Sequence, residues 1–145
     1  MSDSINLIYP AIITNIITLF LFIHSKSQDQ MLLLVMIIGQ LVLISGESDK
    51  NLDKIQLSHI LFTTTLIFGS LYFNEIHNKI FVFSLLLVTI VSRYILEGCL
   101  FNMSNSHHEF QFESVFDFIN YDYLFYISII ILSYRLFKDK ISNNL

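Results

Sequence analysis

The chain contains five long apolar blocks, of which the first four are joined by short polar links and the fifth follows a longer polar connection. The blocks span residues 5–23, 31–45, 55–73, 80–101 and 123–137. The fourth block extends to Phe101 if Arg93 and Glu97 are tolerated inside it, and otherwise ends at about Tyr94. A helix rises about 1.5 Å per residue, so the first, third and fourth blocks can cross a hydrocarbon core of about 30 Å. These blocks predict five transmembrane helices, with four spans as the main alternative.

The second and fifth blocks are the short ones, because a helix over either block alone is only about 22 Å long. Such a helix must sit in a thinner bilayer, extend into its polar flanks, or cross incompletely. The sequence leaves these three alternatives open.

The blocks do not show the alternation of polar and apolar residues that is typical of outer-membrane barrel strands. Residues 31–38 (MLLLVMII) are apolar throughout. Strands also rarely exceed ten residues, and in hydrocarbon a helix satisfies every backbone amide within its own segment. We therefore predict an all-α fold, a single helical bundle over residues 1–145, in which the short links make successive helices antiparallel neighbours.

The composition supports a membrane protein rather than a soluble domain. Hydrophobic residues make up 54% of the chain and charged residues 14%, against about a quarter charged in a soluble domain. The net charge is −4 with only eight Lys and Arg residues, which argues against nucleic acid as a partner. The expected environment is a lipid bilayer.

The basic residues predict an orientation in that bilayer. With five spans, the C-terminal side carries Lys26, Lys79, Arg135, Lys138 and Lys140. The other side carries Lys50 and Lys54, together with Arg93 if that residue faces it. The positive-inside rule then places the C-terminus in the cytosol and the N-terminus outside. Because no basic residue precedes the first block, we expect that block to be a retained span rather than a cleaved signal.

Five polar residues are expected to converge at similar depth in the outer half of the bundle. They are Asn15, Gln40, His59, Arg93 and Glu97. Asn15 and Gln40 are the kind of residues that hydrogen-bond between helices. Arg93 and Glu97 are four positions apart, so they can pair along one helix face and anchor its end. Alternatively, His59 joins them in a proton-titratable cluster that lines an outward-facing cavity.

The long polar connection before the last block contains an amphipathic pattern. Phe112, Val115, Phe116 and Ile119 recur at helical spacing, which predicts a short helix at the membrane interface. Its apolar face can pack onto the bundle or bind a protein partner, and Phe112, Phe116 and Ile119 are the candidate partner surface.

The sequence lacks the motifs of the common catalytic and metal sites. It contains no G-x-S-x-G, H-E-x-x-H, Walker A or dinucleotide-binding pattern. Cys99, His107, His108 and Glu109 do not have the paired spacing of a zinc site. We expect no metal, no cofactor and no enzymatic activity. A lipid-modifying enzyme that uses His59 and Glu97 is the third alternative for function.

The segment 92–102 reads SRYILEGCLFN, a span that closes on an aromatic residue, followed by charged and glycine positions and then Cys-aliphatic-Phe. This pattern resembles small multi-span membrane proteins of large DNA viruses. The abundance of Ile, Phe, Tyr, Asn and Ser also fits an AT-rich coding genome. The resemblance implies an accessory or virion-membrane protein and assigns no catalytic residue.

Two functions of different classes follow. The first is a non-enzymatic structural or assembly role, in which residues 102–122 and the termini tie a membrane to a protein partner or to a second copy of the chain. The second is a small channel or transporter, whose path the five polar residues line.

Overall fold

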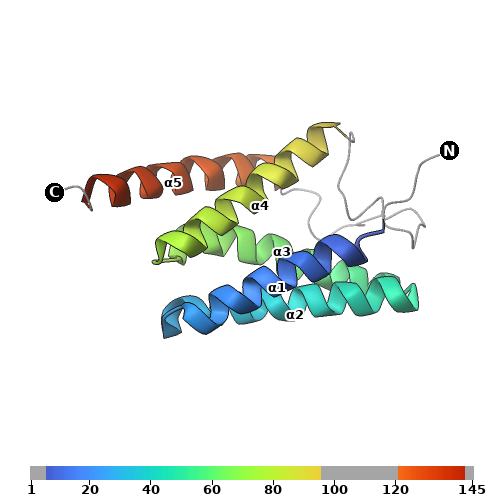
Figure 1. Ribbon diagram of the computed structural model, residues 1–145. Coiled ribbons are helices and arrows are strands. Elements are labelled where there is room, and N and C mark those ends of the chain that lie inside the picture. Colours follow the sequence, from blue (N-terminus) through green and yellow to red (C-terminus); the bar gives the residue numbers. More distant parts are fainter. Residues whose placement is uncertain (1–5, 96–120, 143–145) are drawn as a thin grey trace.

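A computed structural model describes residues 6–95 and 121–142 of the chain. Within these residues the fold consists of five α-helices (Figure 1). They are α1 (Ile8–His24), α2 (Ser27–Asp49), α3 (Leu52–Tyr72), α4 (Ile76–Ile95) and α5 (Tyr121–Ser142). The all-α prediction is confirmed for this part of the chain. The amphipathic helix predicted around Phe112 lies outside the described residues.

Two helices are much longer than the apolar blocks from which they were predicted. α2 has 23 residues and α5 has 22, so both are at least about 33 Å long. Of the three alternatives for the short blocks, the structure shows extension into the polar flanks. The links shrink accordingly, and α1 and α2 are joined by Ser25 and Lys26 alone.

The turn between α2 and α3 explains how a link can be so short. Lys50 takes a left-handed conformation (φ 52°), and its backbone N–H donates to the Gly46 carbonyl at the end of α2. The Asn51 side chain then accepts a hydrogen bond from the Lys54 backbone N–H at 3.2 Å, which caps the start of α3. Two residues therefore reverse the chain.

Three of the five helices, α2, α3 and α4, are long and apolar enough to cross a membrane. α1 is a shorter apolar helix of 17 residues. Length and composition thus support three of the predicted spans among the described residues, and the spans at α1 and α5 stay predictions.

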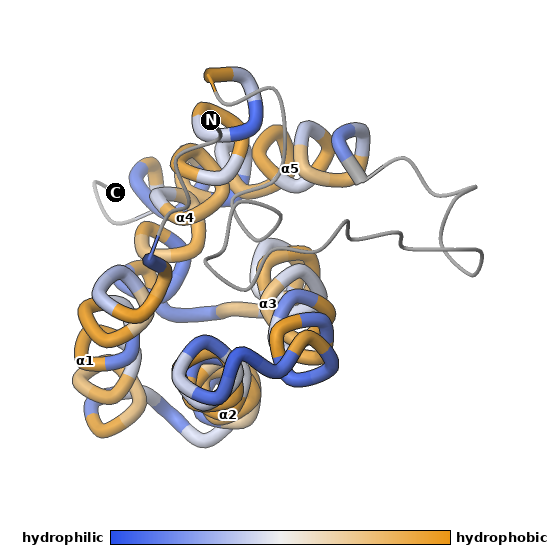
Figure 2. Tube along the Cα trace, turned by 90° about the vertical axis from the view of Figure 1, so that its right-hand side faces the viewer, coloured by the Kyte–Doolittle hydropathy of each residue, from blue (hydrophilic) through white to orange (hydrophobic). Residues whose placement is uncertain are grey.

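The helices form two groups, α1 to α3 and α4 with α5, and the view of Figure 2 looks nearly along α2 and α3. α2 packs most extensively against α3 and α1, whereas α5 packs against α4 and α3. A Cβ atom on Gly39 would lie 3.1 Å from the Leu61 Cβ atom, and one on Gly46 would lie 2.9 Å from the Ile55 Cγ1 atom. The absence of a side chain at these two positions lets α2 approach α3 closely.

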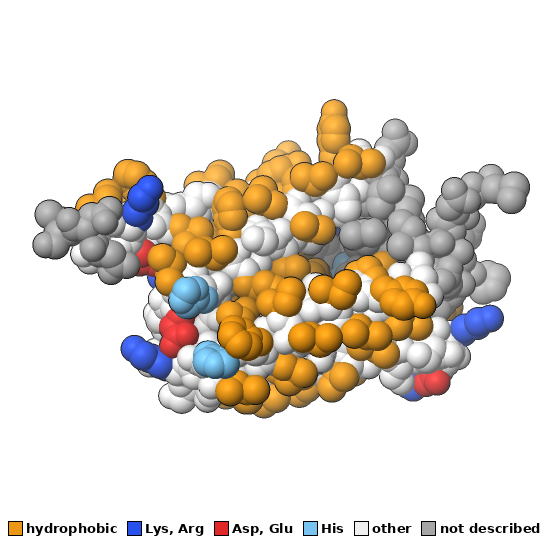
Figure 3. All heavy atoms as spheres, in the orientation of Figure 1, with side chains coloured by type: hydrophobic (Ala, Val, Ile, Leu, Met, Phe, Trp, Pro, Cys, Tyr) orange, Lys and Arg blue, Asp and Glu red, His pale blue; other side chains and the backbone are white. Residues whose placement is uncertain are grey.

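The main core joins both groups of helices. It is made of buried apolar side chains from α2 to α5: Leu33, Met36, Leu66, Phe73, Val82, Leu86, Phe125 and Leu132. The outer faces are also apolar. Ile16 on α1 and Ile130 on α5 are 62% and 68% exposed, and hydrophobic side chains are spread along the whole length of the face in Figure 3. An apolar surface of this extent is one that a bilayer would cover.

Candidate functional site

The two ends of the bundle differ in character. One end, where α1 ends and α2 begins, is here called the basic end. It carries the basic residues that the topology assigned to the C-terminal side: Lys26, Lys79, Arg135, Lys138 and Lys140. The opposite end, where α1 begins, contains a cavity and is called the cavity end.

The basic end is closed around Asp29, a carboxylate that is only 1% exposed. Asp29 accepts hydrogen bonds from the backbone N–H groups of Asn74 and Glu75, both at 3.0 Å. It also accepts one from the Asn78 side chain at 2.7 Å. Since these groups lie just before and within the first turn of α4, the carboxylate satisfies N–H groups that α4 leaves unbonded and faces the positive end of its dipole.

Two further contacts connect α5 to this end. The Lys79 ammonium on α4 pairs with Asp139 on α5 at 2.5 Å, and the Lys79 side chain is 6% exposed. The Arg135 guanidinium donates to the carbonyls of Ser70 and Phe73 at 2.7 and 2.5 Å. These carbonyls belong to the C-terminal end of α3, where cations are favoured. The sequence pattern did not indicate that Asp29, Lys79 and Arg135 form contacts between helices.

The middle of the bundle holds a smaller polar network. The Asn15 side chain on α1 donates to the Gln40 amide oxygen on α2 at 3.1 Å. The Gln40 side chain in turn donates to the Thr18 hydroxyl at 3.1 Å. The structure therefore brings Asn15 and Gln40 together, and it adds Thr18, which the sequence reasoning missed. The i,i+3 spacing of Asn15 and Thr18 on one face of α1 was the available signal.

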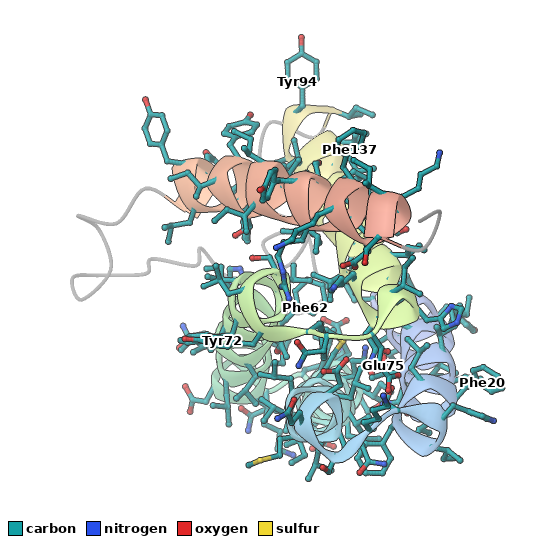
Figure 4. The ribbon with its side chains drawn as sticks, turned by 90° about the vertical axis from the view of Figure 1, so that its left-hand side faces the viewer. Phe20, Phe62, Tyr72, Glu75, Tyr94 and Phe137 are labelled. Atoms are coloured by element: carbon teal, nitrogen blue, oxygen red, sulfur yellow. The ribbon has the colours of Figure 1, made fainter. Side chains whose placement is uncertain are left out.

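A cavity of about 140 Å³ lies at the cavity end. It is bounded by the start of α1, by the second half of α4 and by residues of α2, α3 and α5. Its lining is Leu7, Pro10, Ala11, Thr14, Gln40, Leu43, His59, Phe62, Thr63, Leu85, Val88, Thr89, Ser92, Arg93 and Phe125. Figure 4 shows Phe62 inside the bundle, whereas Phe20 and Tyr94 point outward.

Three of the five residues predicted to converge line this cavity. They are Gln40, His59 and Arg93. Asn15 reaches the cavity wall through its bond to Gln40. The fifth residue, Glu97, lies outside the described residues, so its predicted pairing with Arg93 does too. Within the described residues Arg93 pairs with Asp122 on α5, with Nε 2.6 Å from the carboxylate oxygen.

Most hydroxyl groups of the lining are committed to their own helices. The Thr14 hydroxyl donates to the Pro10 carbonyl at 2.8 Å. Thr89 donates to the Leu85 carbonyl, and Ser92 to the Thr89 carbonyl, both at 2.8 Å. Because these protons are used, the cavity presents mainly apolar groups, with polarity concentrated at Gln40, His59, Thr63 and Arg93.

No metal-binding group of three or more His, Cys, Asp or Glu residues occurs within residues 6–95 and 121–142. Cys99, His107, His108 and Glu109 lie outside these ranges, as do the partner-surface residues Phe112, Phe116 and Ile119. No family model, curated protein or solved structure matches this chain significantly.

Proposed function

We propose that this chain is an integral membrane protein with five spans, whose basic end faces the cytosol. The three long apolar helices and the apolar outer faces support membrane insertion. The five basic residues at one end support the orientation, because positively charged residues are retained on the cytosolic side. The cavity end and the N-terminus then face outward.

Within that membrane, we propose a small-molecule carrier that receives its ligand in the cavity. The supporting observation is the contrast between the two ends: a cavity at one, and helix ends joined by buried polar contacts at the other. Binding pockets are concave and largely apolar, with a few polar groups that orient the ligand, and this cavity has that composition.

The structural or assembly role stays a prediction. It depends on residues 102–122, which lie outside the described residues except for Tyr121 and Asp122. The carrier is preferred because it depends on side chains whose positions are described. No observation favours the lipid-modifying enzyme over either role.

A tryptophan reporter tests the cavity directly, because the chain has no Trp of its own. Phe62 lines the cavity, so Phe62→Trp places the only tryptophan of the variant there, and it is excited selectively at wavelengths that the tyrosines do not absorb. Ile16→Trp places one on the outer face of α1 as the control for partitioning into lipid. In nanodiscs, 6-bromohexanol and 6-bromohexanoate serve as quenching ligands. We expect saturable quenching of the Phe62→Trp reporter by at least one of them and a linear, non-saturable effect at Ile16→Trp.

A matched pair of substitutions on α4 separates filling of the cavity from general damage. Thr89 and Ser84 both donate their hydroxyl to the carbonyl four residues earlier, but only Thr89 lines the cavity. Thr89→Phe should abolish the saturable quenching, and Ser84→Phe should leave it intact. If quenching at Phe62→Trp is as linear as at Ile16→Trp for both ligands, the proposed carrier is wrong.

Thiol labelling tests the orientation. In a Cys99→Ser background, Thr63→Cys places a thiol in the cavity wall. We expect an impermeant maleimide to reach it only from the side on which Lys54 lies. Labelling from the side of Lys138 would contradict the proposed direction of access.

A further inference from the structure

The side chains that line the cavity include basic residues but no acidic ones among the described residues. The ionisable side chains of the lining are His59 and Arg93. Building on the proposed carrier, we propose that the ligand is an amphipathic anion, a short-chain carboxylate whose head binds at Arg93 and whose chain lies against the apolar wall.

The other polar groups of the lining are less suited to bind the head of a ligand. The Gln40 amide is used twice, as an acceptor from Asn15 and as a donor to Thr18. The hydroxyls of Thr14, Thr89 and Ser92 donate to their own helix. Thr63 and His59 also line the cavity, but the Arg93 guanidinium is the lining group that stays protonated at any working pH, so an anion gains charge-assisted hydrogen bonds there that a neutral alcohol or amide does not.

The contact between Arg93 and Asp122 shows how this guanidinium meets a carboxylate. Asp122 binds the Nε atom at 2.6 Å, yet Asp122 is not part of the lining. The ion pair therefore holds the guanidinium from outside the cavity. A guanidinium carries five N–H donors in a planar fork, so one group can serve Asp122 and a second carboxylate together.

The size of the cavity limits the apolar part of the ligand. An apolar cavity of about 150 Å³ in another protein binds benzene, which has six carbon atoms. The present cavity of about 140 Å³ is comparable. Its apolar wall comes from several helices, with Leu43, Phe62, Leu85 and Phe125 contributing large side chains. A chain of about six carbons fits this space by the same comparison.

The two bromohexyl ligands differ only in their head group, so they test the charge preference with the Phe62→Trp reporter. At a pH well above the carboxyl pKa, we expect 6-bromohexanoate to bind about tenfold more tightly than 6-bromohexanol, as a hydrogen bond to a charged group implies. Arg93→Gln should abolish this difference, and Arg93→Lys should retain part of it. 6-Bromohexylamine should bind more weakly than either.

Lys54 provides the matched control for Arg93. It is a basic residue at the same end of the bundle and is likewise ion-paired, with Asp49, but it does not line the cavity. Lys54→Gln should leave the preference for the carboxylate unchanged.

The outcomes separate this inference from the proposed carrier. Equal affinity for the alcohol and the carboxylate, or tighter binding of the amine, overturns the anion while leaving a binding cavity in place. A preference that survives Arg93→Gln also overturns the assignment to Arg93. Absence of saturable quenching by both the alcohol and the carboxylate overturns the carrier itself, and the anion with it.

Discussion

The basic end and the cavity end both place ionised side chains among apolar helices, but they use them differently. At the basic end, Asp29 is almost fully buried and is bonded to the backbone of the link before α4. At the cavity end, Arg93 is held by a half-exposed Asp122 and borders a hollow. Burial therefore distinguishes charges that hold helices together from charges that are available to a ligand. Substituting a charge at the basic end should therefore lower the free energy of unfolding more than substituting Arg93 at the cavity end.

Removing the carboxylate at the centre of the basic end should have the largest effect. Asp29→Ala leaves two backbone N–H groups without their acceptor and removes one of the two hydrogen bonds that the Asn78 amide donates, the other being to Ser25. We expect it to lower the free energy of unfolding by about 3 kcal/mol, because each lost bond to a charged group costs about 1.5–3 kcal/mol and partial hydration offsets some of the sum. SDS titration in mixed micelles, followed by circular dichroism, measures the change.

Asp53 is the control for that substitution, since it is an exposed acidic residue in the first turn of α3. Asp53→Ala should change the free energy of unfolding by no more than about 0.5 kcal/mol. Similar losses in the two variants would mean that Asp29 is no more than a surface charge.

Substitution of Arg135 should cause the second largest loss in the free energy of unfolding. Arg135→Ala removes the two hydrogen bonds to the carbonyls of Ser70 and Phe73, which join α5 to α3. The expected loss is about 2 kcal/mol in the same titration, with Arg135→Lys between the alanine variant and the native chain. Lys138→Ala, an exposed neighbour on α5, should have little effect. An Arg135→Lys variant as stable as the native chain would show that the two simultaneous hydrogen bonds of the guanidinium add nothing to the stability.

The polar network of Asn15, Thr18 and Gln40 in the middle of the bundle should contribute less to the free energy of unfolding than Asp29 or Arg135. A double-mutant cycle with Asn15→Leu and Gln40→Leu isolates their shared hydrogen bond of 3.1 Å. Hydrogen bonds between membrane helices average about 0.6 kcal/mol in such cycles, and we expect a value of that size. If the two substitutions change the free energy of unfolding by strictly additive amounts, the two side chains do not interact.

Arg93 should have the smallest effect on stability. Its pair with Asp122 is partly exposed, with side-chain accessibilities of 28% and 48%. Exposed ion pairs contribute about 0.2–1 kcal/mol, so Arg93→Gln should cost about 0.5 kcal/mol or less in the same SDS titration. A loss as large as that of Asp29→Ala would show that Arg93 holds the fold, and the contrast between the two ends would disappear.

The sequence alone determined the helices of this protein, because runs of apolar residues longer than any strand leave the helix as the structure that satisfies its own backbone. It also determined that Lys26 and Lys79 share one end, since short links force alternation of direction, and the count of five spans added Arg135 to that end. It predicted Asn15 and Gln40 as hydrogen-bonding residues, because an amide side chain among apolar neighbours needs a partner.

The tertiary structure decided which side chains meet across helices. Asp29 and Asn78 are 49 positions apart, and Lys79 and Asp139 are 60 apart. Such pairs depend on the rotation and offset of each helix, which hydrophobic periodicity does not fix when a helix is apolar on most sides. The end of α2 and the start of α3 also depended on local caps, at Lys50 and Asn51 respectively, rather than on where the apolar blocks stop and begin. The cavity is likewise a property of the assembled helices, because it forms where five separate segments fail to fill the space between them.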